Sequence, residues 1–284
     1  MTVAAPPTQR ILDADALGVQ LDDVVVVDTR IPEAFANLHV PGAVNIPLRT
    51  ALMEDTSRES LETLAEQARA ALGSRGVTAA DTLVMVDDGD GSAAVAAMIA
   101  ELAGAHEVRM LLGGIFAWVN AGGELASGPG DRDAVEFGGQ TSWSGLAPIE
   151  DMQSGPADGT SLLDVRSQLE HEGIVGSPCC AARGHIPGSL HLEWSRLLSA
   201  SGQLLDAARI QDELAQIGLG PSDALIVYCH SGVRSALATL ILRDAGFTRV
   251  RNSLGSWHEW AQRGLPLAPS LTGHSGPAHG QLIG

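Results

Sequence analysis

Short apolar runs alternate with amphipathic stretches along the whole chain. In the first half, apolar runs at residues 24–28, 82–86 and 108–111 are separated by polar, helix-like stretches such as residues 60–73. Brief continuous apolar runs are typical of strands that are buried on both faces of a parallel sheet, and the intervening helices supply the crossover connections. The pattern predicts an α/β fold in which parallel sheets are flanked by helices.

The second half of the chain repeats the first. At a constant separation of 142 residues, the stretch 81–125 aligns with the stretch 223–267, and the order of strand-like and helix-like segments is the same in both. Because identical residues recur in register, we interpret the chain as a duplicated domain. The matched pairs include Asp81 and Asp223, Gly104 and Gly246, Trp118 and Trp260, and Gly122 and Gly264.

The duplication defines the expected domain boundaries. We expect an N-terminal domain over residues 1–126 and a C-terminal domain over residues 146–270. The intervening stretch 127–145 is rich in glycine and has no periodic pattern, so we interpret it as a linker. We expect residues 271–284 to form a flexible tail.

Composition excludes several classes of function. The 284 residues carry a net charge of −17 with only 17 basic residues, and no basic stripe indicates binding to nucleic acid or to a membrane surface. No apolar stretch reaches the roughly 18 to 20 residues of a membrane span, and the first residues lack the features of a signal peptide. Three cysteines do not resemble a secreted disulfide framework, so we expect a cytoplasmic monomer.

A residue that occurs in both halves is better explained by a role in the fold than a residue that occurs in one half only. Each half ends an apolar run with Asp-x-Arg and continues to a His-x-Pro-Gly turn. We interpret these as strand-end ion pairs and backbone-bonded turn histidines, rather than as an active-site pair or a metal ligand, because no second ligand stands at metal spacing. A tryptophan in each half is interpreted as a core anchor. The residues concerned are Asp28 and Arg30, Asp164 and Arg166, His39 and His185, and Trp118 and Trp260.

One loop differs between the halves. The first half reads VDDGDGSAA at residues 86–94, and the second reads YCHSGVRSA at residues 228–236, so that Cys229 replaces Asp87 and Arg234 replaces Ser92. A cysteine and an arginine that occur together in one half only predict a chemical site that is present once. The first loop also matches a loose dinucleotide fingerprint, but such a match alone is weak and the second loop lacks it.

The loop after Cys229 is suited to holding an anion. Gly232 permits a positive φ, and a helix is expected to begin near Arg234. Backbone N–H groups together with a helix N-terminus stabilise negative charge, so the Cys229 thiol should ionise readily and a group transferred to its sulfur should be held there. We therefore predict Cys229 as the catalytic nucleophile rather than a buried structural cysteine. The predicted anion-binding loop comprises His230, Ser231, Gly232, Val233, Arg234 and Ser235.

Cys-x-x-Gly-x-Arg-Ser after a buried strand, with Asp-x-Arg and Gly-His-Ile-Pro-Gly upstream, resembles the rhodanese sulfurtransferases. A tandem arrangement with the cysteine in the second half is similar to the thiosulfate and 3-mercaptopyruvate sulfurtransferases. The resemblance implies that Cys229 takes sulfur from a small anionic donor, carries it as a persulfide and passes it to cyanide or a thiol. It implies no cofactor and no metal. We expect Arg183, Arg234 and Trp257 to bind the substrate.

This chain departs from that family pattern in ways that leave alternatives open. Val233-Arg234-Ser235 replaces the Val-Thr of many two-domain members, and residues 170–176 lack the usual donor-binding arginine, so the donor stays open. Phosphatase or arsenate-reductase chemistry is the second candidate, although those loops read Cys-x5-Arg and this one reads Cys-x4-Arg. A persulfide carrier for a protein partner is the third. Ten additional residues in the second half contain Cys179 and Cys180, interpreted as incidental loop cysteines with a redox role as the alternative. His258 is expected to be merely exposed.

Overall fold

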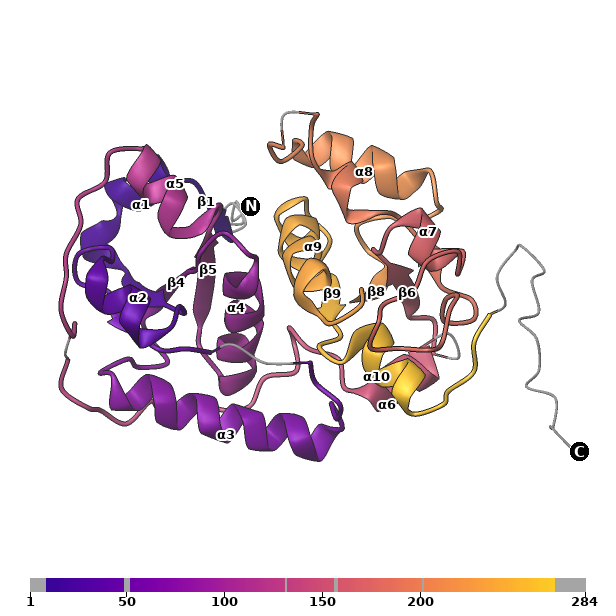
Figure 1. The fold of residues 1–284 in the computed structure, drawn as a ribbon, viewed down its shortest axis with the longest axis horizontal. Helices are drawn as coiled ribbons and strands as arrows, with labels where there is room; N and C mark the ends of the chain where they lie inside the picture. Colours follow the sequence, from indigo (N-terminus) through magenta and orange to yellow (C-terminus); the bar gives the residue numbers. More distant parts are fainter. Residues whose placement is uncertain (1–8, 49–51, 131, 156–157, 201, 269–284) are drawn as a thin grey trace, which may run out of the picture.

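The computed structural model describes residues 9–48, 52–130, 132–155, 158–200 and 202–268. Each half of the chain folds around a parallel sheet with helices packed on both of its faces (Figure 1). The α/β architecture and the duplication predicted from the sequence are therefore confirmed. The predicted tail at residues 271–284 lies outside the described residues.

The first sheet has the strand order β1-β5-β4-β2-β3, and every neighbouring pair is parallel. Its central strand β4 is buried over four of its five residues, as its continuous apolar sequence requires. The strands are β1 (Ile11–Leu12), β2 (Val25–Asp28), β3 (Val44–Asn45), β4 (Thr82–Val86) and β5 (Glu107–Leu111). The helices are α1 (Ala14–Val19), α2 (Pro32–Asn37), α3 (Arg58–Ser74), α4 (Ser92–Ala103) and α5 (Gly114–Asn120).

The second sheet has the order β7-β6-β8-β9 and is also parallel throughout. At the position that β1 occupies in the first sheet, the second sheet has an isolated parallel bridge between Leu146 and Asn252. The strands are β6 (Ser161–Asp164), β7 (Leu190–His191), β8 (Ala224–Tyr228) and β9 (Arg249–Asn252). The helices are α6 (Ile149–Ser154), α7 (Gln168–His171), α8 (Ala207–Ala215), α9 (Val233–Asp244) and α10 (Ser256–Gln262).

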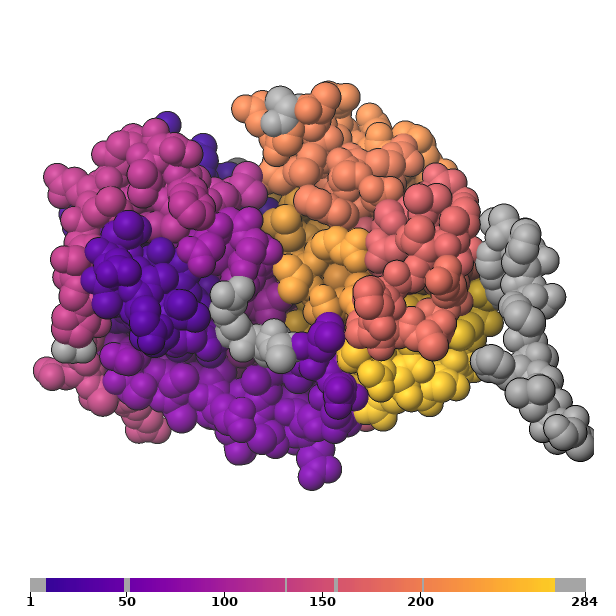
Figure 2. All heavy atoms as spheres, in the orientation of Figure 1, coloured from indigo at the N-terminus to yellow at the C-terminus, as the bar shows by residue number. Residues whose placement is uncertain are grey.

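The two halves pack against each other through α4 and α9, which lie side by side between the two sheets (Figure 1). Half of the residues of α4 are alanine and α4 is buried on every side, while α9 contributes Ala236 and Ala238. Small side chains let the two helix backbones approach closely, and one hydrophobic core cluster runs through both halves. The space-filling view shows the surfaces of the two halves in contact (Figure 2).

Buried carboxylates supply polar contacts between the two halves. Glu101 of α4 accepts a hydrogen bond from Arg243 of α9 at 2.8 Å, and these two residues stand 142 positions apart. The fully buried carboxylate of Glu259 accepts the backbone N–H of Thr56 at 2.9 Å, which ties α10 to the chain segment before α3. Buried charge is tolerated here because each carboxylate is hydrogen-bonded and paired with an arginine.

The residues shared by both halves serve the fold, as predicted. Arg30 pairs with Asp28 at 2.7 Å, and Arg166 pairs with Asp164 at 2.6 Å. The turn histidines bond to backbone carbonyls, and the tryptophan indoles each donate to a carbonyl six residues further along the chain. The pairs are His39 Nδ1 with Phe35 O, His185 Nδ1 with His171 O, Trp118 Nε1 with Glu124 O, and Trp260 Nε1 with Pro266 O.

Residues 132–139 of the predicted linker pack against the first half. Val135 N–H donates to Gly73 O, Ala79 N–H donates to Phe137 O, and the Phe137 side chain is buried in the core.

No helix in the described part of the chain has the length and apolar character that crossing a membrane requires.

Candidate active site

Cys229 lies at the carboxyl end of β8, at the start of the loop that leads into α9. Its side chain is 1% exposed, and the Ser235 hydroxyl donates to its Sγ at 3.4 Å. Its backbone N–H donates to Ser256 Oγ at 3.1 Å, and its carbonyl accepts the Trp257 N–H at 3.0 Å. The start of α10 therefore holds both sides of the Cys229 backbone in place.

Gly232 shapes the loop. It adopts a φ of +83° and forms the N-cap of α9, and its carbonyl accepts a hydrogen bond from Asn252 Nδ2 at 3.2 Å. A Cβ at this position would lie 2.5 Å from the backbone oxygen of Leu254. Glycine is required here for both reasons, because only glycine adopts this φ freely and fits this close approach.

The equivalent loop of the first half carries an aspartate in place of the cysteine. Asp87, which stands at the position equivalent to Cys229, accepts the N–H of Gly89 at 2.8 Å and the N–H of Ala93 at 2.9 Å. Burial raises the pKa of the Asp87 carboxyl, and these amide donors oppose that effect. The first half thus directs two loop amides at the side chain in this position. The loop of the second half has its positive φ at Gly232, whereas the first loop has it at Gly89 and Gly91, so the two backbones follow different courses.

Arg234 is held by an acidic partner that the sequence pattern did not reveal. Its guanidinium donates to both carboxylate oxygens of Glu170 at 2.8 and 2.9 Å. Glu170 also occupies the N3 position of a capping box with Ser167 at the start of α7, and the Ser-x-x-Glu spacing indicates this helix start but not the pairing with Arg234. Burial alone would raise the pKa of Glu170, but the hydrogen bonds from Arg234 lower it to about 2.

The Glu170–Arg234 pair should make the stability of the second half sensitive to acid. Because the folded-state pKa of Glu170 lies below its ordinary value of 4.5, its contribution is complete above about pH 4.5 and is lost as the pH falls toward 2. We expect Glu170→Gln to lose stability at neutral pH and to show a weaker decline in this range. Urea unfolding between pH 2 and 7 measures this, with the exposed Glu62→Gln as the control. An unchanged acid decline in Glu170→Gln would contradict it.

Two predicted substrate-binding residues have other contacts. Arg183 is exposed, and its Nη1 donates to the carbonyl of Ile174 at 2.8 Å, within the additional segment of the second half. Trp257 is 2% exposed, and the Arg166 guanidinium lies 4.4 Å from the centre of its ring. Trp257 therefore packs in the core beneath the loop, and substrate binding by these two residues stays a prediction.

Ser256, which accepts the Cys229 N–H, adopts a φ of +51° and is the single non-glycine residue with positive φ in the described ranges. The equivalent residue in the first half is Gly114, with a φ of +58°. The serine hydroxyl also donates to the carbonyl of Ser253 at 2.6 Å. In the second half, a non-glycine residue therefore adopts a strained backbone conformation at the position where its hydroxyl lies beneath Cys229.

Exchanging this serine separates the hydroxyl from the strain. Ser256→Ala and Ser256→Gly both remove the acceptor of the Cys229 N–H, but only the glycine relieves the positive φ. We expect Ser256→Gly to be more stable than Ser256→Ala by about 1 kcal/mol. Urea unfolding of the two variants measures the difference, and equal stabilities would show that this backbone conformation costs nothing.

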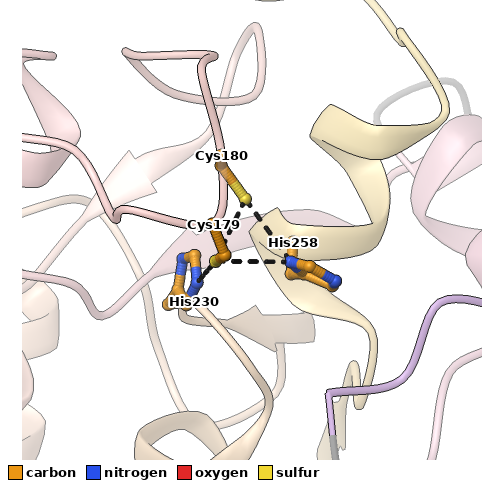
Figure 3. Close-up of side chains that lie close together, drawn as sticks. All are labelled: Cys179, Cys180, His230 and His258. Carbon is orange, nitrogen blue, oxygen red and sulfur yellow. Dashed lines mark hydrogen bonds between the residues drawn. The ribbon is translucent and has the colours of Figure 1, made fainter.

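Four potential metal ligands lie together at the outer side of the loop (Figure 3). They are Cys179 and Cys180 of the additional segment, His230 of the loop and His258 of α10. From the sequence we expected no metal site and an exposed His258, but His258 is only 2% exposed because α10 packs it beneath the additional segment. No local spacing could have indicated this cluster, since its members come from three separate parts of the chain.

Comparison with known proteins places this geometry in a family. The family model described as "Rhodanese-like domain" matches twice, at residues 13–121 and 149–263. The "Probable 3-mercaptopyruvate sulfurtransferase" of Pseudomonas aeruginosa is 30% identical over 286 residues, covering 93% of this chain and 98% of the relative. The "Thiosulfate sulfurtransferase" of Azotobacter vinelandii is 28% identical over 244 residues, covering 84% and 88%.

A solved structure agrees with these relatives. The "Crystal Structure of Probable Thiosulfate Sulfurtransferase" superimposes with a TM-score of 0.68 at 32% identity, and the match covers 87% of this chain and 98% of that chain. The two matched domains coincide with the two parallel sheets, and Cys229 lies in the second. The chain therefore belongs to the rhodanese family of sulfurtransferases and carries two rhodanese-like domains in tandem.

Proposed function

We propose that the protein moves sulfane sulfur from thiosulfate to cyanide or a thiol through a persulfide on Cys229, with 3-mercaptopyruvate as the second candidate donor. The observation that carries this proposal is the comparison of the two loops. The loop of the first half holds a buried carboxylate with two backbone amides, and the loop between the equivalent strand and helix of the second half holds a buried thiol that accepts a hydroxyl hydrogen bond. A loop built to hold an anion beside a nucleophilic sulfur suits a persulfide.

In the proposed first step, the Cys229 thiolate attacks the outer sulfur of thiosulfate. A new sulfur–sulfur bond forms on Cys229 as the bond inside thiosulfate breaks, and sulfite leaves with that bonding pair. In the second step, cyanide attacks the terminal persulfide sulfur, thiocyanate leaves, and the Cys229 thiolate is restored. No net oxidation of the protein occurs over the cycle.

The loop supplies the stabilisation that both steps need. Negative charge resides on the Cys229 thiolate at the start and on the terminal sulfur of the persulfide afterwards. The Ser235 hydroxyl donates to Cys229 Sγ, and the twelve-residue helix α9 begins at Val233, so its N-terminus belongs to the same loop and favours negative charge there. Arg234 contributes less free positive charge than its position alone implies, because Glu170 already neutralises it.

The short loop, Cys-x4-Arg, supports sulfur transfer over phosphatase chemistry, because it is one residue shorter than the Cys-x5-Arg loop that holds a tetrahedral oxyanion. The names of the relatives include both donors and support the general reaction without choosing between them. Phosphatase or arsenate-reductase chemistry on Cys229 is the alternative enzyme, and sulfur delivery to one protein partner is the alternative to turnover with small acceptors.

The test is thiocyanate formation from cyanide with thiosulfate and 3-mercaptopyruvate as parallel donors. We expect turnover with thiosulfate, and donor alone should increase the mass of the Cys229 peptide by one sulfur atom. Silence with both donors, together with hydrolysis of an aryl phosphate, would replace the proposal with phosphatase chemistry. A persulfide that forms but resists small acceptors would point to a protein partner.

A further inference from the structure

The cluster of Cys179, Cys180, His230 and His258 takes no part in the proposed sulfur transfer, yet its four ligand atoms all lie within 4.8 Å of one another. Two thiols and two imidazoles form a complete ligand set for a structural zinc site. The first half has no comparable set, since it lacks the additional segment and has Asp88 and Phe116 where the second half has His230 and His258.

Four of the six distances between ligand atoms lie close to those of a tetrahedral site, and the remaining two do not exceed 4.8 Å. Zinc bonds of about 2.3 Å to sulfur and 2.0 to 2.1 Å to nitrogen place tetrahedral ligand atoms roughly 3.3 to 3.8 Å apart. Cys179 Sγ lies 3.6 Å from Cys180 Sγ, 3.1 Å from His230 Nε2 and 3.7 Å from His258 Nδ1. Cys180 Sγ lies 3.4 Å from His258 Nδ1.

The surrounding structure positions the ligands in advance. The backbone N–H of His258 donates to the carbonyl of His230 at 2.9 Å, which fixes the two histidine-bearing segments against each other. The cysteine pair sits on a turn in which Cys180 N–H donates to Ser177 O at 3.0 Å. The His258 ring is buried, and its polar contacts among the described residues are the two thiols, so its Nδ1 points into the cluster (Figure 3).

We propose that Cys179, Cys180, His230 and His258 bind one zinc ion. Binding converts both thiols to thiolates and releases two protons to solvent, while the imidazoles bind in the neutral form, so the two negative charges balance the divalent cation. Thiolate and imidazole ligands favour a soft or borderline cation such as zinc over magnesium or calcium. No oxidation or reduction is involved.

The position of His230 gives the site a consequence for catalysis, and this part rests on the proposed function. His230 directly follows Cys229, so zinc ties the anion-binding loop to the additional segment and to α10. We expect bound zinc to restrict access to Cys229 and to slow its reaction with a donor. Removal of the metal would release the loop.

Cobalt titration of the reduced, chelator-treated full chain tests the site without requiring turnover. We expect one equivalent of Co²⁺ to bind, with a thiolate-to-cobalt charge-transfer band and the intense visible bands of a tetrahedral site, and zinc to displace it. The double variant Cys179→Ala/Cys180→Ala should lose the charge-transfer band. His230→Ala should weaken binding at least tenfold, and the exposed His106→Ala should bind like wild type.

Alkylation supplies a second, independent readout. With zinc present, iodoacetamide should modify Cys179 and Cys180 far more slowly, and Cys229 more slowly as well, as located by peptide mass. The zinc proposal is overturned if the reduced chain binds no cobalt, if the spectrum lacks thiolate bands, or if the double variant binds equally well. Protection of Cys179 and Cys180 without any effect on Cys229 would keep the site and remove its role in gating. A protein with the cobalt spectrum but no sulfur transfer would leave the site standing and refute the proposed function alone.

Discussion

Replacing Cys229 with serine is expected to reduce sulfur transfer by at least about 10⁴-fold, because the hydroxyl cannot form a persulfide and nothing else in the loop carries a transferable sulfur. The substitution is nearly isosteric, and the Ser235 hydroxyl can keep its partner, so the fold should be retained. Thiocyanate formation measures the loss, and thermal unfolding checks the fold. The Cys229 peptide of the variant should gain no sulfur mass when the protein is incubated with thiosulfate.

Asp87→Ser is the matched control, because it places the same side chain at the equivalent position of the first half. It removes a buried carboxylate that accepts two amides, so we expect it to lower stability while leaving sulfur transfer within a few-fold of wild type below its unfolding temperature. If Cys229→Ser retained turnover, the nucleophile would be another group. If Asp87→Ser were equally inactive, the division of labour between the two halves would be wrong.

Replacing Gly232 with alanine is expected to damage both stability and activity. The alanine must adopt a φ of +83°, and its Cβ meets the backbone oxygen of Leu254 at 2.5 Å, so the loop has to shift. We expect a loss of at least about 2 kcal/mol in the free energy of unfolding. Because the loop amides then leave their positions around Cys229, turnover should fall by about 10²-fold even where the protein is fully folded.

Gly218 offers a matched comparison, since its φ is +82° but a Cβ there would meet nothing within 4 Å. Gly218→Ala should therefore carry only the conformational cost, about 1 to 2 kcal/mol, and should keep full turnover per folded molecule. Urea unfolding and thiocyanate assays on both variants separate the two effects. Equal losses for Gly232→Ala and Gly218→Ala would mean that the contact with Leu254 is unimportant for the loop.

The fold was predictable because the signals that specify it are local. Buried parallel strands appear in the sequence as short apolar runs. The helices between them have a regularly spaced apolar face that is buried, formed in α3 by Leu61, Ala65, Ala68 and Leu72. Short elements are less predictable: β3 and β7 contain only two residues each, Val44–Asn45 and Leu190–His191. Two-residue edge strands depend on pairing with a neighbour more than on their own composition.

The candidate site was predictable only in part. The loop, its glycine and Cys229 stand next to one another in the chain, so the comparison of the two halves identified them together. Arg234 was read as a free cation for the donor, whereas Glu170 binds it with both carboxylate oxygens. That pairing joins residues 64 positions apart, and nothing in either local pattern indicates it.

By itself, the sequence determined the duplication, the two parallel α/β domains and the one loop in which the halves differ, because strand and helix periodicity and repeated positions are properties of the chain read in order. The tertiary structure alone decided what surrounds that loop: the Ser256 hydroxyl beneath Cys229, Glu170 on Arg234, and the meeting of Cys179 and Cys180 with His230 and His258. These contacts join segments that only the packing of the sheet and its helices brings together, since strands β6 and β8 end at the same edge of the sheet and α10 begins beside them.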